Sequence, residues 1–282
     1  MTIQRYDEAV AYEPDYSGLE LSAEEIEAGA HRTYVGGVWD THGQRQVEFL
    51  RSHGLEPQHT LLDVGCGAFR AGRHFIDYLD AGNYYGIEAN QSVIQAGYDH
   101  ELDDEQRAKT PVGHLRVSDR FYAEFDGTRF DYALAQSVFT HVSLNHMRLC
   151  LFRLAMVMKP GGKFYATFFE KPDDTRIGMV FNAKRQKPMF TEKNVFWYFR
   201  SDLEWVASFS PWKVRYLGDW GHPAGQVMME YTRMTPAETK AWRAARATGA
   251  ASTQPRPITE DVLDLGKRVK AGVARRISQR RG

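Results

Sequence analysis

One turn between two apolar runs restricts the fold of this chain more than any other feature. The first run, Leu61-Leu62-Asp63-Val64, leads into the turn Gly65-Cys66-Gly67. A helix-like pattern follows, and a second apolar run ends in Glu88, 25 residues after Asp63. A strand, a glycine turn that lets backbone approach a ligand, and an acid at the next strand tip together predict a nucleoside-binding α/β unit.

The turn does not fit a dinucleotide. A dinucleotide fingerprint is Gly-x-Gly-x-x-Gly, and Arg70 stands where its third glycine would be. Asp63 would repel a pyrophosphate, and no Gly-Lys-Ser or Gly-Lys-Thr phosphate loop occurs in the sequence. An acid before the turn suits a cationic ligand. S-adenosylmethionine, which carries an ammonium and a sulfonium but no phosphate, meets that requirement.

Strand and helix patterns alternate after the turn, as a doubly wound sheet requires. The predicted strands are residues 60–64, 83–87, 114–118, 130–135 and 163–169, and the predicted helices are residues 70–80, 90–102 and 143–158. Pro160-Gly161-Gly162 stops the last of these helices. Residues 212–219 and 226–233 then predict an antiparallel pair of strands.

Four segments resemble the class I S-adenosylmethionine-dependent methyltransferases in order and spacing. They are Asp63–Gly67, Glu88, Phe130–His141 and Met158–Phe164. The resemblance covers roughly residues 55–235 and implies an α/β fold, a Rossmann-like seven-stranded doubly wound sheet. It further implies that helices in residues 1–54 form a lid. Residues 171–200 form an insertion after the fifth strand, where α/β proteins build substrate sites, so we expect it to bind the acceptor. Residues 236–282 form a basic C-terminal extension with a helical pattern. The family often has a third glycine where Phe69 stands.

The resemblance also implies how S-adenosylmethionine is bound. The turn Gly65–Gly67 would pass under the methionine and ribose, and Glu88 would accept hydrogen bonds from the ribose hydroxyls. Asp119 would lie near the adenine amine, although it could instead cap a helix. The lid aromatics would contact the cofactor or pack on the core. The candidate cofactor residues are Tyr34, Trp39, Asp63, Gly65, Cys66, Gly67, Glu88, Ala89, Asp119 and Gln136.

Methyl transfer requires the protein to position the acceptor and to remove or screen a proton. Histidine is the usual base for a hydroxyl near neutral pH. His141, directly after the fourth strand, is the first candidate, and Glu170 and His222 come next. The alternative for both histidines is a structural role in a turn. We expect no metal site, because Glu170, Asp173 and Asp174 are more simply explained as solvated acids.

Several acceptors are disfavoured by the residues present. Amino-methylating enzymes of nucleic acids carry Asp/Asn-Pro-Pro-aromatic where this chain has Ala135-Gln136-Ser137-Val138. Neither Cys66 nor Cys150 follows a proline, as methylation of a base carbon requires, and polyamine synthases have an acid at Gln136. The expected acceptor is therefore a small-molecule or carbohydrate hydroxyl. A membrane lipid, a lipid-linked glycan, or a non-catalytic scaffold role are the alternatives.

The formal net charge is zero, but the charge is unevenly distributed. Residues 235–282 hold 11 Lys/Arg and 4 Asp/Glu, and the rest of the chain holds 25 and 32. An acidic body opposes nucleic-acid binding. Residues 262–277 predict a basic amphipathic helix, either solvated or bound to a peripheral membrane or an acidic partner. No signal peptide or membrane span is predicted, and the two cysteines favour a cytoplasmic location.

Overall fold

The computed structural model describes residues 20–171, 180–182, 187–189 and 195–247. The chain divides into two compact units, Met1–Thr235 and Pro236–Gly282. In the second unit the described residues form one helix, α9 (Pro236–Ala247). The predicted amphipathic pattern at 262–277, most of the insertion, and both Asp173 and Asp174 lie outside the described residues. Within the described ranges, no helix is long and apolar enough to span a membrane.

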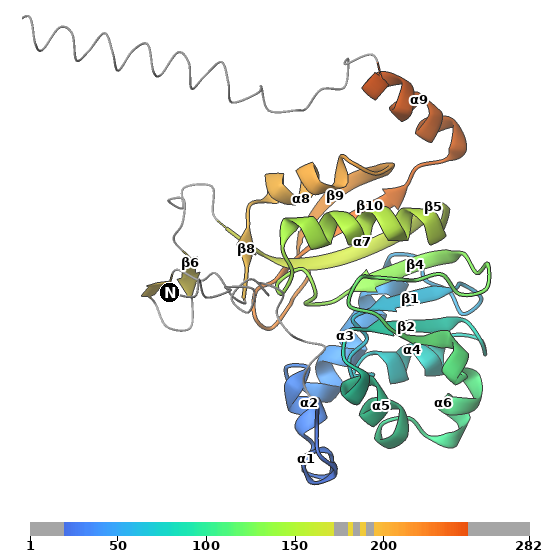
Figure 1. Cartoon of the computed structure of the whole chain (residues 1–282), viewed down its shortest axis with the longest axis vertical. Helices are drawn as coiled ribbons and strands as arrows, with labels where there is room; N and C mark the ends of the chain where they lie inside the picture. Colours follow the sequence, from blue (N-terminus) through green and yellow to red (C-terminus); the bar gives the residue numbers. More distant parts are fainter. Residues whose placement is uncertain (1–19, 172–179, 183–186, 190–194, 248–282) are drawn as a thin grey trace, which may run out of the picture. The chain divides into compact units, whose positions relative to one another are not determined.

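The first unit is built on one mixed sheet (Figure 1). Its strands are β1 (Leu61–Val64), β2 (Tyr84–Glu88), β3 (Leu115–Val117), β4 (Phe130–Ala135), β5 (Met158–Glu170), β8 (Trp197–Tyr198), β9 (Trp212–Asp219) and β10 (Val227–Arg233). The order is β3-β2-β1-β4-β5-β10-β9, and β8 pairs with the end of β5. Strands β1 to β5 are parallel, whereas β10 is antiparallel to β5 and β9. The predicted seven-stranded doubly wound sheet is confirmed, with β8 as one additional short strand.

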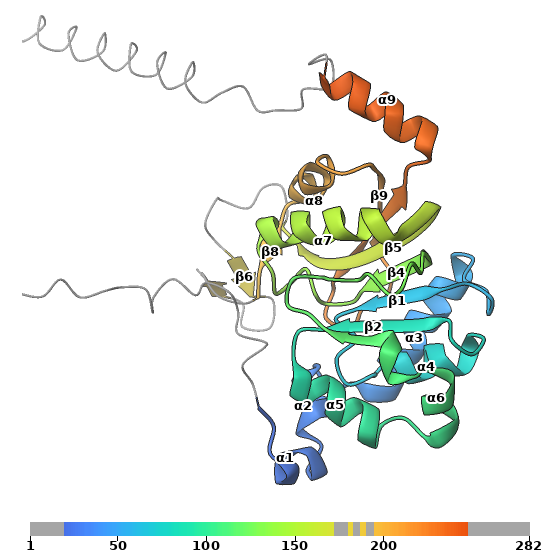
Figure 2. The same cartoon turned by 45° about the vertical axis from the view of Figure 1, so that its right-hand side comes forward.

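Helices cover both faces of this sheet (Figure 2). They are α1 (Ala23–Glu27), α2 (Ala30–Tyr34), α3 (Trp39–Ser52), α4 (Gly72–Tyr78), α5 (Gln91–His100), α6 (Asp104–Lys109), α7 (Leu144–Val157) and α8 (Arg200–Ala207). Leu62 and Ala133 pack in the core under α7 and α8, while Leu61 and Leu134 pack in the core under α3, α4 and α5. Because successive strand residues point to opposite faces, each strand supplies both cores. A further pair, β6 (Val180–Asn182) and β7 (Lys187–Met189), forms a small separate sheet.

The observed elements follow the predicted ones closely, with one instructive difference at β5. This strand begins at Met158, five residues before the predicted start. Its pairing with β4 shifts from Phe130–Met158 to Tyr132–Lys163, so Pro160–Gly162 forms a bulge in the strand. Gly161 has φ of 82°, a conformation that favours glycine. The helix does end before the proline, as predicted, at Val157.

The lid begins with a capping box, in which Ser22 and Glu25 exchange side-chain-to-backbone hydrogen bonds. Its longest helix, α3, lies directly on the backbone that follows the glycine turn. A Cβ atom on Gly43 would be 2.2 Å from the carbonyl oxygen of Arg70. Arg45 donates a hydrogen bond to the carbonyl of Gly221 in the β9–β10 link. These contacts place α3 between the glycine turn and that link.

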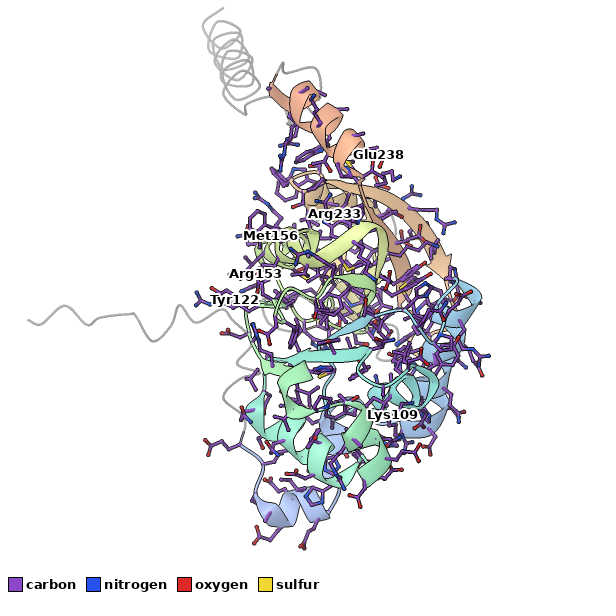
Figure 3. All side chains as sticks on the ribbon, turned by 90° about the vertical axis from the view of Figure 1, so that its right-hand side faces the viewer. Lys109, Tyr122, Arg153, Met156, Arg233 and Glu238 are labelled. Atoms are coloured by element: carbon purple, nitrogen blue, oxygen red, sulfur yellow. The ribbon has the colours of Figure 1, made fainter. Side chains whose placement is uncertain are left out.

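Contacts around α7 fix the opposite face of the sheet (Figure 3). The guanidinium of Arg153 lies 3.4 Å from the ring centroid of Tyr122, which belongs to the segment after β3. Arg233, at the end of β10, donates to the carbonyl of Ala155 at 2.7 Å. Two arginines thus attach α7 to distant parts of the chain, and the loop that leads into α7 has a defined position at the end of β4.

Candidate functional site

A cavity of about 940 Å³ opens at the carboxyl ends of β1, β2 and β4. Its walls come from the loop between α2 and α3, the glycine turn, the ends of β2 and β3, the loop before α7, and the β9–β10 link. In open α/β sheets this edge, where neighbouring strands β1 and β4 lead to helices on opposite faces, is where ligands bind. The fold therefore brings the glycine turn and the end of β4, the two parts of the predicted site, into one cavity.

The glycine turn leaves no space for side chains. Gly65 and Gly67 have φ of 72° and 57°. A Cβ atom on Gly65 would lie 2.5 Å from Cγ2 of Val138, and one on Gly67 would lie 2.6 Å from Cγ1 of Val35. Phe69, which occupies the place of a third glycine, still has the left-handed φ of 63°. The turn thus keeps its backbone shape despite that departure, at a cost of roughly 1 kcal/mol in strain.

Two buried carboxyl groups flank this turn. Asp63 accepts a hydrogen bond from the Tyr84 hydroxyl at 2.9 Å, and burial raises the pKa of Asp63 to about 7. Glu88 accepts from the backbone N–H groups of Gly67 and Asn90 at 3.0 and 3.1 Å. Burial also raises the pKa of Glu88. Because a carboxylate can accept about four hydrogen bonds, Glu88 retains capacity for a ligand in the cavity.

Arg70 adds a positive charge to the same wall. Its Nη1 atom donates to the carbonyls of Val35 and Gly37 at 2.6 and 3.0 Å, so the guanidinium joins the lid loop to the glycine turn. Burial lowers the pKa of Arg70 to about 10, and the group therefore remains a cation at neutral pH. Arg70 also lines the cavity. Opposite charges therefore face one part of the pocket, Asp63 and Glu88 on one side and Arg70 on the other.

A hydrogen-bonded network occupies the other end of the cavity. The backbone N–H of Ala224 donates to Nδ1 of His222 at 3.0 Å, so the ring proton of the neutral histidine must be on Nε2. The terminal amide of Gln136 lies 2.9 Å from this Nε2 atom. Because Nε2 donates, the amide of Gln136 must be oriented with its oxygen towards Nε2. In this orientation the amide nitrogen takes the place of the other terminal atom of the Gln136 side chain. That position is buried and has no hydrogen-bond partner among the described residues.

The same network continues to the strands. Ser137 bridges the amides of Gln136 and Gln226, at 2.8 and 2.9 Å from its hydroxyl oxygen. Thr167 donates to Gln226 at 2.6 Å and accepts from the backbone N–H of Ser137 at 2.7 Å. Ser137 itself has φ of 61°. The chain of donors and acceptors is complete except for the Gln136 amide nitrogen, which remains available to a ligand.

Two histidines on this side are held neutral. The rings of His42 and His222 are 4.7 Å apart, edge to face. Burial, with help from the nearby charge of Arg70, lowers the pKa of His42 to about 3 and that of His222 to about 4. Nδ1 of His42 is buried and has no hydrogen-bond partner within the described part of the chain. This end of the cavity therefore presents uncharged polar groups.

Most of the predicted site residues lie together on the cavity wall. Tyr34, Asp63, Gly65, Cys66, Gly67, Glu88, Ala89, Asp119, Gln136, His141 and His222 all line it. Burial raises the pKa of the Cys66 thiol well above its ordinary value, so this cysteine is a packing residue of the turn. His141 lies in the loop between β4 and α7, where its backbone N–H donates to the carbonyl of Val138 at 2.9 Å.

The prediction for Trp39 is corrected by the structure, which places this residue outside the cavity wall. Trp39 opens α3, and its ring centroid lies 5.1 Å from the guanidinium of Arg32 and 5.7 Å from that of Arg73. Its edge also faces the ring of His31. The ring is thus used to pack the lid helices against α4, on the side away from the ligand.

Glu170 is likewise not part of the cavity wall. It ends β5 beside β8, and its carboxylate accepts a hydrogen bond from the Tyr216 hydroxyl of β9. The strand direction there carries the side chain towards the antiparallel edge of the sheet. Glu170 is therefore a structural acid in this fold. Among the described residues, no group of three or more His, Cys, Asp or Glu side chains is placed to hold a metal ion.

Sequence reasoning missed several residues of the wall, notably His42, Gln46, Arg70 and Gln226. His42 and Gln46 are one turn apart on α3, on the same buried face as Gly43. Polar residues on the buried stripe of an amphipathic helix could have marked them. In the sequence, Arg70 stands out only because it replaces the third glycine of a dinucleotide fingerprint. No motif marks Gln226.

Known proteins share this fold. A family model described as a methyltransferase domain matches residues 62–164. An S-adenosylmethionine-dependent methyltransferase from Clostridium acetobutylicum is 10% identical, over 76% of this chain and 100% of that one, with a TM-score of 0.53. An amino pentose methyltransferase from Micromonospora echinaspora is 16% identical over 78% and 100%, with a TM-score of 0.51. A glycopeptide N-methyltransferase is 14% identical over 70% and 96%, with a TM-score of 0.52.

Proposed function

We propose that the chain is a class I S-adenosylmethionine-dependent methyltransferase and that it methylates a hydroxyl group of a small molecule or carbohydrate. Its cofactor is S-adenosylmethionine. One observation carries the choice of a hydroxyl. Among the described residues, the carboxyl groups of the cavity wall are Asp63, Glu88 and Asp119, which follow the first three strands, whereas no carboxyl group lines the wall around Gln136 and His222.

The wall residues fit the cofactor chemically. The side-chain-free turn at Gly65 and Gly67 lets backbone approach a ligand, and Glu88 has spare acceptor capacity for ribose hydroxyls. Asp63 and Glu88 offer negative charge to an ammonium or a sulfonium. When bound, S-adenosylmethionine supplies a methyl group on a sulfonium that is already a good leaving group. The protein then has to orient an acceptor oxygen and accept its proton.

The polar groups at the end of β4 suit that task. The Gln136 amide nitrogen can donate to one lone pair of an acceptor hydroxyl, which leaves another lone pair to be aimed at the methyl carbon. His141 lines the same cavity and is the base that we propose for the hydroxyl proton. His222 is a positioning residue, because Ala224 donates to one of its ring nitrogens and the other donates to Gln136.

This wall would bind an ammonium acceptor less favourably than a hydroxyl acceptor. A cation near Gln136 would meet the charges of Arg45 and Arg70, which already lower the pKa of His222, and within the described part of the chain no carboxylate lines that part of the wall. One protein of similar fold is nevertheless named as a glycopeptide N-methyltransferase, and another is named as an amino pentose methyltransferase. Methylation of a nitrogen acceptor is therefore the competing outcome of the test.

The test is a turnover screen with S-adenosylmethionine and matched acceptors, namely sugars and phenols against amino sugars, with the methylated product identified by mass spectrometry. We expect methyl transfer to oxygen. His141→Gln should lower kcat at least about 100-fold with little change in cofactor affinity. His100→Gln, on the exposed end of α5, is the matched control and should leave kcat unchanged. Transfer to amino groups alone, or full activity of His141→Gln, would refute the proposal.

A further inference from the structure

His42 is a polar residue at a position where an apolar residue would pack without leaving a polar atom unpaired. It lies on the buried stripe of α3 with Gly43, Val47 and Leu50, and its exposed fraction is only 3%. Its side chain lines the cavity, yet Nδ1 is buried and has no hydrogen-bond partner among the described residues. A buried polar atom without a partner is unfavourable. In a cavity wall, such an atom indicates a partner that arrives with a ligand.

Contacts with the β9–β10 link hold the ring of His42 in place. Its centroid lies 5.9 Å from that of Trp220 and 4.7 Å from that of His222. Burial lowers the pKa of His42 to about 3, so the imidazole is neutral at physiological pH. A neutral imidazole has one donor and one acceptor nitrogen, and a hydroxyl group both donates and accepts. The ring is therefore suited to an uncharged hydroxyl group of a ligand.

A second unpaired group contacts the same histidine of the link. The amide of Gln136 accepts from Nε2 of His222, and the other terminal position of that amide is buried without a partner in the described part of the chain. Both ring nitrogens of His222 are occupied, because Ala224 donates to Nδ1. One imidazole thus contacts two cavity residues that each have an unused hydrogen-bonding atom, Gln136 at the end of β4 and His42 of the lid.

We propose that His42 binds a second hydroxyl group of the acceptor, on the carbon next to the one whose hydroxyl group is methylated. Gln136 holds the oxygen that receives the methyl group, and His42 holds its neighbour. The two hydroxyl groups must be close together because both side chains contact the ring of His222. The substrate class is then a molecule with adjacent hydroxyl groups, such as a sugar, and not a simple alcohol or phenol. This assignment rests on the proposed O-methylation.

The test measures how much the second hydroxyl group contributes to turnover by the full chain. Methyl pyranosides are compared with their deoxy analogues, and catechol with phenol, by the release of S-adenosylhomocysteine. In the wild type, kcat/KM should be about 10- to 100-fold higher for the compound with adjacent hydroxyl groups. His42→Phe keeps an aromatic ring beside His222 and should abolish this preference by slowing only the diol. His42→Gln keeps a hydrogen-bonding group and should retain part of the preference.

His53→Phe is the matched control. His53 follows α3, outside the cavity wall, and its ring centroid lies 4.2 Å from that of Phe49. This variant should keep the full preference for the diol. Equal kcat/KM for the two compounds of each pair in the wild type would overturn the role of His42 but leave O-methylation standing. An equal loss for both compounds in His42→Phe would show a purely structural role and also overturn it.

Transfer to nitrogen alone would instead refute O-methylation. Amino alcohols compared with the corresponding amines would then measure the contribution of a neighbouring hydroxyl group in the same variants, and the absence of a preference would overturn the role of His42 as well.

A binding measurement covers the case in which no probe is turned over. Nitrogen-15 signals of His42 are recorded in the complex with S-adenosylhomocysteine and assigned by their loss in His42→Phe. Saturating methyl pyranoside or catechol should shift these signals, because a ring nitrogen gains a hydrogen-bond partner, whereas the deoxy analogue or phenol should not. Unchanged His42 signals with every diol would overturn the assignment.

Discussion

The side-chain amide of Gln136 lies 2.9 Å from Nε2 of His222, the ring nitrogen that carries the proton of the neutral histidine. Ala224 donates its backbone N–H to the other ring nitrogen, so His222 is a donor at Nε2 and an acceptor at Nδ1. Burial lowers its pKa to about 4. A histidine in this state orients its partner and does not collect a proton from the acceptor at neutral pH.

We therefore expect His222 to remain the neutral Nε2–H tautomer from pH 5.5 to pH 8. Nitrogen-15 NMR of the imidazole groups measures this directly, with the signals assigned by their loss in His222→Gln. The stability that this histidine contributes is present above pH 6.5 and is lost as the pH falls through about 4, since the folded pKa is depressed. Titration of His222 near pH 6.5, or a proton on Nδ1, would contradict the network.

Asp63 should make cofactor binding depend on pH. Burial raises the pKa of Asp63 to about 7, so a protonated fraction is present in the free protein at neutral pH. A bound ammonium or sulfonium favours the charged form and expels the proton. The affinity for S-adenosylmethionine should consequently rise about tenfold between pH 5.5 and pH 7.5.

Titration calorimetry in two buffers of different ionisation enthalpy would measure this proton release. Asp63→Asn should bind more weakly and show a flat pH profile. The uncharged thioether 5′-methylthioadenosine is the control ligand, because it lacks both cationic groups. The same raised pKa means that the contribution of Asp63 to folding stability is fully present below pH 3.8 and is lost as the pH rises through about 7. A pH-independent affinity in wild type would refute the role given to this acid.

Glu88 should act on the nucleoside end of the cofactor alone. Glu88→Gln keeps the shape of the side chain but has only one acceptor oxygen for Gly67, Asn90 and a ribose. We expect roughly a 100-fold loss of affinity for S-adenosylhomocysteine and a similar loss for 5′-methylthioadenosine, since both contain the ribose. Asp63→Asn should instead spare the second ligand, which lacks the cationic groups. If the two variants have the same ligand profile, the division of the wall into nucleoside and amino-acid ends is incorrect.

Substitution of Gly67 should destabilise the protein for two reasons, backbone strain and contact with Val35. Its φ is 57°, and a Cβ atom there would lie 2.6 Å from Cγ1 of Val35. Gly67→Ala should lower the free energy of unfolding by about 2–4 kcal/mol. Adding Val35→Ala should restore the part due to contact and leave the part due to φ.

Gly127→Ala is the matched control for backbone strain alone. Its φ is 82°, and no atom of the described residues lies within 4 Å of an added Cβ. Urea unfolding of the three variants would give the comparison. The loss in Gly67→Ala should exceed that in Gly127→Ala by the amount that Val35→Ala restores. Equal losses in both glycine variants would show that Val35 does not press on the turn.

Local patterns were sufficient to predict the sheet and the cofactor end of the site. The acid Asp63, the glycine turn and the acid Glu88 each sit at a strand end, and parallel strands bring their carboxyl ends to one edge. The position of the late antiparallel strands was also predictable, because alternation of side chains marks them. The same patterns also made Glu170 a candidate catalytic residue, because it ends a strand. In the structure its carboxylate accepts a hydrogen bond from the Tyr216 hydroxyl of β9.

The sequence by itself determined the doubly wound sheet and predicted the family and the cofactor, since these depend on residues within one turn and one strand spacing. Only the tertiary structure decided which distant side chains meet across the cavity. His42 of the lid reaches His222, 180 positions later, and Arg70 bonds the carbonyls of residues more than 30 positions before it. Trp39 lies outside the cavity wall, with its ring against the guanidinium groups of Arg32 and Arg73. Such contacts have no period or spacing along the chain, because packing of whole helices and strands sets them.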